Sequence, residues 1–248
     1  MNKRIVILSV ILALVLSTLA CGVNFNGPDF RSVRGSGVVV SEDREVSDFN
    51  SVDLAGIGNL YIEFGDEESL TIEAEDNFMD YLEADVFGKT LEIKIQSGKN
   101  LRPTVSINYY LTVVELDSIE VSGLGSVKLP ELDVTDFFVD ISGGGNVDIE
   151  QLDAKLLEVD ISGLGNFSID GGYVVRQEIS ISGGGNYKAR RLESEEAYVN
   201  ISGLGNATIR VSDMLDVHIS GGGNVDYFGS PDVTSDVSGL GNIDKLGD

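Results

Sequence analysis

The phrase ISGGGN at 141–146 returns as ISGLGN at 161–166, as ISGGGN at 181–186 and as ISGLGN at 201–206. Its core, Ser-Gly-(Leu/Gly)-Gly-(Asn/Ser), recurs at spacings of 20, 20, 20, 20, 18 and 18 residues. The copies begin at Ser122, Ser142, Ser162, Ser182, Ser202, Ser220 and Ser238. A fixed period of this length is typical of a repeat architecture, in which each unit buries its apolar face against the next unit.

Within each unit, two short runs of alternating apolar and polar residues flank the glycine turn. In one unit, VDI at 159–161 precedes the turn and FSI at 167–169 follows it, which is the pattern of two half-buried strands. The residues expected to point inward are Val159, Ile161, Phe167 and Ile169, together with Leu152 or Leu156 from the connection. So few apolar residues cannot close a core alone, but units stacked at the strand spacing of about 4.8 Å form a continuous apolar column. The sequence therefore predicts an all-β fold, a β-solenoid (β-helix) of stacked repeats of about twenty residues, with right-handed coiling as the expected hand.

The first and third glycines of the motif do not vary. We expect them to serve a sharp turn at positive φ and a close approach between stacked backbones. These positions are Gly143, Gly145, Gly163, Gly165, Gly183, Gly185, Gly203 and Gly205. The middle position alternates between Gly and Leu, and two coil lengths explain this. A twenty-residue coil places Leu and Gly alternately in one column, whereas a forty-residue coil makes one column of Leu and another of Gly.

Stacking also aligns polar side chains into columns. An asparagine column contains Asn146, Asn166, Asn186 and Asn206. Its structural interpretation is that Asn tolerates left-handed backbone angles and that stacked amides hydrogen-bond along the column. Its functional interpretation is a polar stripe that recognises a glycan or a protein. In a second column Asp140 and Asp160 become stacked neighbours, which makes them weak candidates for Ca²⁺ binding.

The beginning of the chain resembles an export signal. Lys3 and Arg4 precede an almost wholly apolar run, and small residues lead to Cys21, the single cysteine. This arrangement resembles the lipobox of bacterial lipoproteins, so we expect residues 1–20 to be a signal peptide and Cys21 to be lipidated. Residues 21–36 are then a tether to the membrane.

Residues 37–248 are expected to form a single β-solenoid domain, with irregular rungs over 37–118 and regular repeats over 119–248. Only residues 76–84 could hold a helical turn or two. The domain has to fold without a disulfide, because it contains no cysteine.

Composition excludes several functions. The net charge is −24, and it becomes −26 (15 basic and 41 acidic residues) once Lys3 and Arg4 leave with the signal. This balance argues against nucleic acid as a partner and against direct docking on anionic lipid. The lone histidine, His218, has no evident catalytic partner, and the basic cluster of Lys188, Arg190 and Arg191 is best interpreted as a solvated face. We identify no catalytic residue and no cofactor.

Several ordered blocks resemble one known family. VSDFNSVDL at 46–54 is followed by GNLYI at 58–62, by LTIEAEDN at 70–77, by LEI at 91–93 and by the VSG repeats from 121. Over roughly residues 46–230 the chain resembles the family "putative auto-transporter adhesin, head GIN domain" of bacterial surface proteins. The resemblance implies a β-helical, exported, cell-surface domain and brings no established catalytic residues.

The sequence thus favours a non-enzymatic surface lipoprotein, held to the membrane through Cys21, that presents a rigid acidic solenoid to an extracellular glycan or protein. A polysaccharide-active enzyme on a β-helix is the alternative, and a weak Ca²⁺-dependent binding module is another. The oligomeric state is left open.

Overall fold

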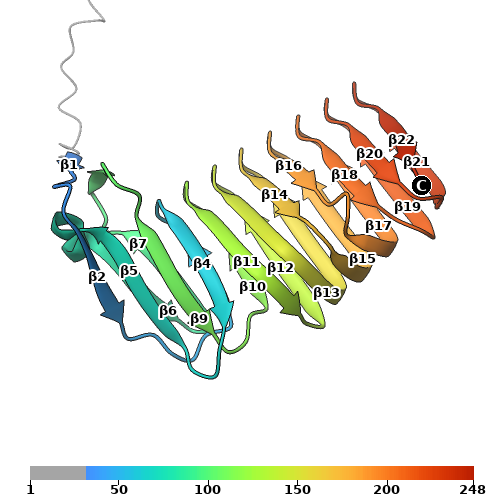
Figure 1. Ribbon diagram of the computed structural model, residues 1–248. Helices are drawn as coiled ribbons and strands as arrows, with labels where there is room; N and C mark the ends of the chain where they lie inside the picture. Colours follow the sequence, from blue (N-terminus) through green and yellow to red (C-terminus); the bar gives the residue numbers. More distant parts are fainter. Residues whose placement is uncertain (1–31) are drawn as a thin grey trace, which may run out of the picture. The chain divides into compact units, whose positions relative to one another are not determined.

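The computed structural model describes residues 32–248. Residues 1–31, with the predicted signal peptide and Cys21, lie outside the described residues. The described chain is nearly all β-structure and forms a β-solenoid of about six turns, which confirms the predicted fold class (Figure 1). No helix among these residues is long and apolar enough to cross a bilayer.

The N-terminal part of the solenoid contains nine strands and the 3₁₀ helix η2. They are β1 (Ser32–Arg34), β2 (Val39–Arg44), β3 (Ser51–Leu54), β4 (Asn59–Phe64), β5 (Ser69–Glu75), η2 (Asp76–Tyr81), β6 (Leu82–Phe87), β7 (Thr90–Ile95), β8 (Asn100–Arg102) and β9 (Asn108–Val113).

The C-terminal part contains the regular coils. Its strands are β10 (Ser118–Glu120), β11 (Ser126–Asp133), β12 (Asp136–Ile141), β13 (Asn146–Ile161), β14 (Asn166–Ile169), β15 (Gly172–Ile181), β16 (Asn186–Lys188), β17 (Glu193–Ile201), β18 (Ala207–Arg210), β19 (Met214–Ile219), β20 (Val225–Phe228), β21 (Asp232–Val237) and β22 (Ile243–Gly247).

The strand register decides the coil length. Asn146 pairs with Asn166, which pairs with Asn186, and all these pairings are parallel. The offset is therefore twenty residues per coil, and it shortens to eighteen where Ala207 pairs with Val225. The twenty-residue coil is correct, and Leu and Gly alternate down one column of turns.

The N-terminal layers follow a different order, which the repeat pattern does not reveal. Ser118 of the first regular coil pairs with Ser51, 67 residues earlier, so the coil of β3 and β4 lies directly beneath the coil of β10 and β11. The next layer consists of β7 under β3 and β9 under β4, although these strands come later in the chain. Beyond them β5 and β6 run antiparallel to β9 and β7. The helix η2 lies between β5 and β6, within the segment expected to be helical, and buries Phe78 and Met79.

One strand lies inside the segment expected to be a tether. Ser32–Arg34 pairs in parallel with Asn100–Arg102, so the last part of residues 21–36 belongs to the folded unit. The buried Glu75 carboxylate accepts hydrogen bonds from the N–H of Gly37 (2.7 Å) and of Thr104 (2.9 Å) and thereby ties these segments together.

The core is a continuous column of stacked side chains. Val159, Ile161, Phe167 and Ile169 are buried as expected, and from the connection Leu152 rather than Leu156 is buried. Identical positions stack on one another, as where the Phe167 and Tyr187 rings lie parallel with centroids 5.0 Å apart. Because the inner coils bury their apolar residues between two neighbours, their outer faces are left to carry function.

Candidate functional site

The glycine turns form a corner of the solenoid in which backbone lies directly on backbone. A Cβ built on Gly163 would lie 1.8 Å from the carbonyl oxygen of Gly143, and one on Gly165 would lie 1.9 Å from that of Gly145. The Leu164 N–H donates to the same Gly143 oxygen at 3.0 Å. The close approach expected from the sequence is therefore present. The expected positive φ is not, because among residues 32–248 the glycines at positive φ are Gly37, Gly58, Gly88, Gly98, Gly172 and Gly229.

The same close approach holds at the other repeat glycines. A Cβ would lie 2.0 Å or less from the carbonyl oxygen of the preceding coil at Gly143, Gly145, Gly183, Gly185, Gly203 and Gly205.

Beside the turns runs a ladder of asparagine amides. The Nδ2 of Asn166 donates to Oδ1 of Asn146 (2.9 Å), that of Asn186 to Asn166 (2.8 Å), and that of Asn206 to Asn186 (3.0 Å). The asparagines do not adopt the left-handed conformation, since the only non-glycine residue at positive φ in 32–248 is Asp48. Each amide satisfies its neighbour, so the ladder stabilises the stack and offers few free groups to a ligand.

The leucines of the turn column lie outside the core. Leu124, Leu164, Leu204 and Leu240 are 72%, 76%, 75% and 92% exposed. Each of the first three leans over the glycine of the next coil, so that a Cβ on Gly144 would meet Leu124 Cδ2 at 2.9 Å. The alternation is thus a packing relation on the surface, in which every second coil supplies a side chain that covers the next turn.

On the flat face before the turns, carboxylates stack in consecutive layers. In spatial order they are Glu92 of β7, Asp53 of β3, Glu120 of β10, Asp140 of β12 and Asp160 of β13. We call these five residues the acidic column. Asp140 and Asp160 were expected to be neighbours. The sequence missed Asp53 and Glu92, because the repeat period does not extend to their layers.

Partial burial, together with the neighbouring charges, raises the pKa of three members of the acidic column. Partial burial and the charge of Asp160 raise the pKa of Asp140, and burial with the charges of Asp53 and Asp140 raises that of Glu120. Burial also raises the pKa of Asp53, although the Ser122 hydroxyl donates to its carboxylate at 2.9 Å. Within residues 32–248 no three acidic, imidazole or thiol side chains are arranged to hold a metal ion, Asp140 and Asp160 included.

His218 lies further along the same face and is exposed. Its Nε2 lies 3.5 Å from Asp216 Oδ1, and its Nδ1 lies 3.9 Å from Asp236 Oδ2. This is a surface arrangement of one imidazole between two carboxylates.

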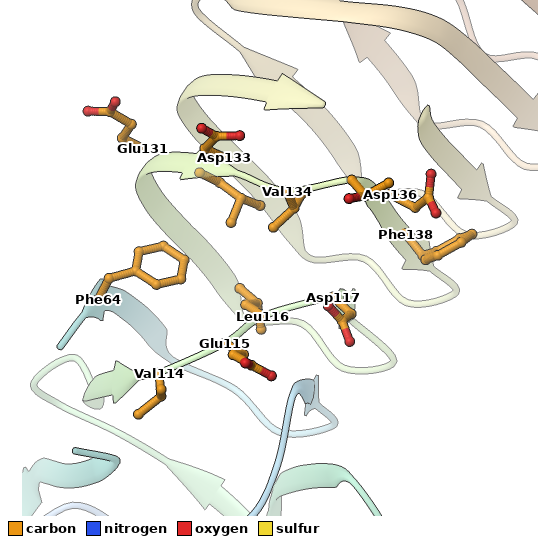
Figure 2. A pocket seen from close by; sticks show the side chains of 12 residues that line it. Phe64, Val114, Glu115, Leu116, Asp117, Glu131, Asp133, Val134, Asp136 and Phe138 are labelled. Carbon is orange, nitrogen blue, oxygen red and sulfur yellow. The ribbon is translucent and has the colours of Figure 1, made fainter. Parts of the chain in front are cut away.

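A hollow lies at the junction between the irregular and the regular layers (Figure 2). It is a groove of about 750 Å³ between the end of β4, the connection 114–117 and the segment 131–136, where β11 passes into β12. Its apolar lining includes Phe64, Val114 and Phe138, which are 41%, 48% and 42% exposed. Its charged lining consists of Glu115, Asp117, Glu131, Asp133 and Asp136, with no basic residue. We call this the junction groove. Sequence reasoning did not find it, because segments distant in sequence form it.

Comparison with known proteins agrees with this architecture. The family model described as "putative auto-transporter adhesin, head GIN domain" matches residues 48–231. A solved structure of a putative adhesin from Bacteroides fragilis superposes with a TM-score of 0.80 at 26% identity, covering 86% of this chain and 100% of that one.

Two more distant structures share the fold. A putative lipid binding protein from Parabacteroides distasonis gives a TM-score of 0.70 at 23% identity, covering 87% of this chain and 100% of that one. A putative adhesin from the same species gives 0.68 at 21% identity, with the same two coverages. A search of curated proteins finds no match.

Proposed function

Because the chain belongs to the family "putative auto-transporter adhesin, head GIN domain", we propose that it is a non-enzymatic binding module of the bacterial cell surface. It presents a rigid acidic solenoid to an extracellular glycan or protein. A lipid on Cys21 holds it to the membrane.

The observation that carries this proposal is the in-register stacking of like groups on the outer faces. The acidic column repeats in consecutive layers and the exposed leucines in every second coil, on a backbone that is hydrogen-bonded from layer to layer. Such a surface binds with little loss of conformational entropy, because the backbone that carries it is already ordered before the partner arrives. Repeated identical groups also suit a partner that is itself repetitive, such as a polysaccharide or an extended protein.

The stacked faces favour binding over catalysis for a chemical reason. General acid–base catalysis on a glycan needs two carboxylates in different environments, one protonated and one ionised, flanking a bound sugar. The acidic column instead presents its carboxylates one above the other on a single flat face. That arrangement suits the binding of a cationic or hydrogen-bonding partner.

A binding screen tests the proposal. The soluble chain from Gly22 onward, which contains the whole described solenoid, is labelled and applied to glycan arrays and to immobilised extracellular matrix proteins. We expect saturable binding to a restricted set of ligands that an unlabelled excess of the chain displaces. Release of reducing sugar or new chain ends from a ligand, with no stable retention, would contradict the proposal and favour the polysaccharide-active alternative.

A further inference from the structure

The junction groove exists because one corner of the solenoid lacks a rung. The coil of β3 and β4 does not close on that corner, since after Phe64 the chain turns back into the antiparallel strand β5. The connection 114–117 leads from β9 to β10 and passes this layer on its way from the layer below to the layer above. The segment 131–136 therefore has a neighbouring coil above it and a hollow below it (Figure 2).

Backbone pairing shows the same asymmetry. Above, the Val134 N–H donates to Asp153 O at 3.0 Å, and the Lys155 N–H donates to Thr135 O at 2.8 Å. Below, pairing begins only at Phe138, whose N–H donates to Asp117 O at 3.0 Å. N–H groups alternate in direction along a parallel strand, so the Asp136 N–H faces the same side as that of Phe138. Among the described residues, the Asp136 N–H donates to no carbonyl of the connection 114–117 below it.

The groove has the side-chain chemistry of a peptide site. Phe64, Val114 and Phe138 expose apolar surface from three different segments, and exposed apolar surface in a concave site favours association. Five carboxylates surround this surface without a compensating lysine or arginine. An occupant that fills the groove has to supply positive charge, because an anionic or neutral one would leave these carboxylates desolvated and unpaired.

From these observations we propose that the junction groove binds an extended peptide segment of a partner protein in which apolar residues alternate with lysine or arginine. The segment supplies the missing rung. One of its carbonyl groups accepts from the Asp136 N–H, its apolar side chains contact Phe64, Val114 and Phe138, and its basic side chains pair with the rim carboxylates. This is strand addition at an unpaired backbone edge, with alternate side chains giving specificity. The inference rests on the proposed function, since it assigns a site and a partner class to the binding module.

The test uses the chain from Gly22 onward and a short fluorescent peptide of alternating lysine and valine, with binding followed by anisotropy at low ionic strength. One control peptide replaces valine by serine, and another replaces lysine by glutamate. The groove variants are Asp136→Lys and Phe138→Ser, both at exposed positions. The matched control is Asp244→Lys, at an exposed carboxylate of β22 in the last coil.

We expect the lysine–valine peptide to bind saturably and both control peptides to bind at least roughly tenfold more weakly. Asp136→Lys and Phe138→Ser should each weaken binding by a similar factor, while Asp244→Lys leaves it unchanged. Hydrogen exchange of segment 131–138 should slow in the complex, because the strand edge becomes paired. Melting temperatures of the three variants report whether they remain folded.

Three results would overturn the proposal. They are equal binding of the lysine–serine peptide, an equal effect of Asp244→Lys, and no change of exchange in 131–138. Any one of these results would mean that the peptide does not add a strand at the groove and is held only by general attraction between opposite charges. If the glycan or matrix ligand from the screen still binds the groove variants with unchanged affinity, the proposed function stands and the groove assignment for that ligand fails.

Discussion

The two glycines of one turn, Gly143 and Gly144, should differ sharply in their tolerance of alanine. A Cβ on Gly143 would lie 2.0 Å from the carbonyl oxygen of Gly123 and 2.6 Å from that of Ser122. A Cβ on Gly144 would meet only Leu124 Cδ2, at 2.9 Å. The first obstacle is backbone held by the coil below, whereas the second is the end of an exposed side chain that can rotate away.

The magnitude follows from what has to move. Carbon and oxygen in contact lie about 3.3 Å apart or more, so Gly143→Ala forces the two coils apart by about 1 Å at this corner. That displacement strains the Gly143 N–H to Val121 O and Gly144 N–H to Gly123 O hydrogen bonds, both 3.0 Å long. Overpacking costs about 1–3 kcal/mol, and two weakened hydrogen bonds add about 1 kcal/mol each. We expect a loss of roughly 3–5 kcal/mol for Gly143→Ala and a change within about 1 kcal/mol for Gly144→Ala.

Thermal and urea unfolding followed by far-UV circular dichroism measure the difference. At about 2–4 °C per kcal/mol for a domain of this size, Gly143→Ala should lower the melting temperature by roughly 10 °C and Gly144→Ala by only a few degrees. Equal shifts for the two variants would refute the reasoning, because the two glycines would then matter only through backbone flexibility. A stable Gly143→Ala protein would contradict the close approach of the coils itself.

Three further predictions concern charge and anchoring. Asp140→Asn should raise the free energy of unfolding at neutral pH by about 0.5 kcal/mol. The same substitution should have little effect in acid, where the carboxyl group of Asp140 is protonated and uncharged like the amide that replaces it. Because the pKa of Asp140 is raised, the stability that this group contributes is present at low pH and is lost as pH rises. Urea titrations at both pH values check this. Burial raises the pKa of Glu75, but hydrogen bonds from Thr104 and Gly37 outweigh burial, so that its pKa in the folded protein is lowered. The stability that Glu75 contributes is therefore present above the ordinary pKa of 4.5 and is lost as pH falls through the lower folded value. Glu75→Gln should therefore lower the melting temperature at neutral pH, and melting curves of variant and parent should converge in strong acid. Cys21→Ser should move the chain from the membrane fraction to the soluble fraction, as immunoblots of separated fractions would show.

Much of the regular half follows from the sequence because every rung repeats the same local chemistry. The strand runs, the turn and the buried Val159 and Phe167 recur at a fixed period, so one unit predicts its neighbours. The reason for the glycines was only half predicted. A sharp turn and a crowded stack both call for glycine, and only the backbone geometry shows that crowding by Gly123 and Gly143 is the operative cause.

The repeat pattern of the sequence could not predict the irregular half or the junction groove. Ser51 lies under Ser118 although 67 residues separate them, because β5 to β9 are placed on the far side of β3 and β4. No spacing in the sequence encodes that reversal of layer order, so neither the full length of the acidic column nor the presence of Phe64 and Phe138 in one groove could be foreseen. The signal that was available is the weak motif copy at Ala55–Asn59, which marks the layer where regular stacking begins.

The central claim, a surface module that binds through its rigid solenoid, is tested most directly by an adhesion measurement. Bacteria that display the full chain and bacteria that lack it are washed over a surface coated with a ligand from the binding screen, and the cells retained are counted. The account predicts higher retention of the displaying cells and loss of that excess when the soluble chain from Gly22 is added as a competitor. Equal retention of both strains, or retention that the soluble chain does not reduce, would contradict it.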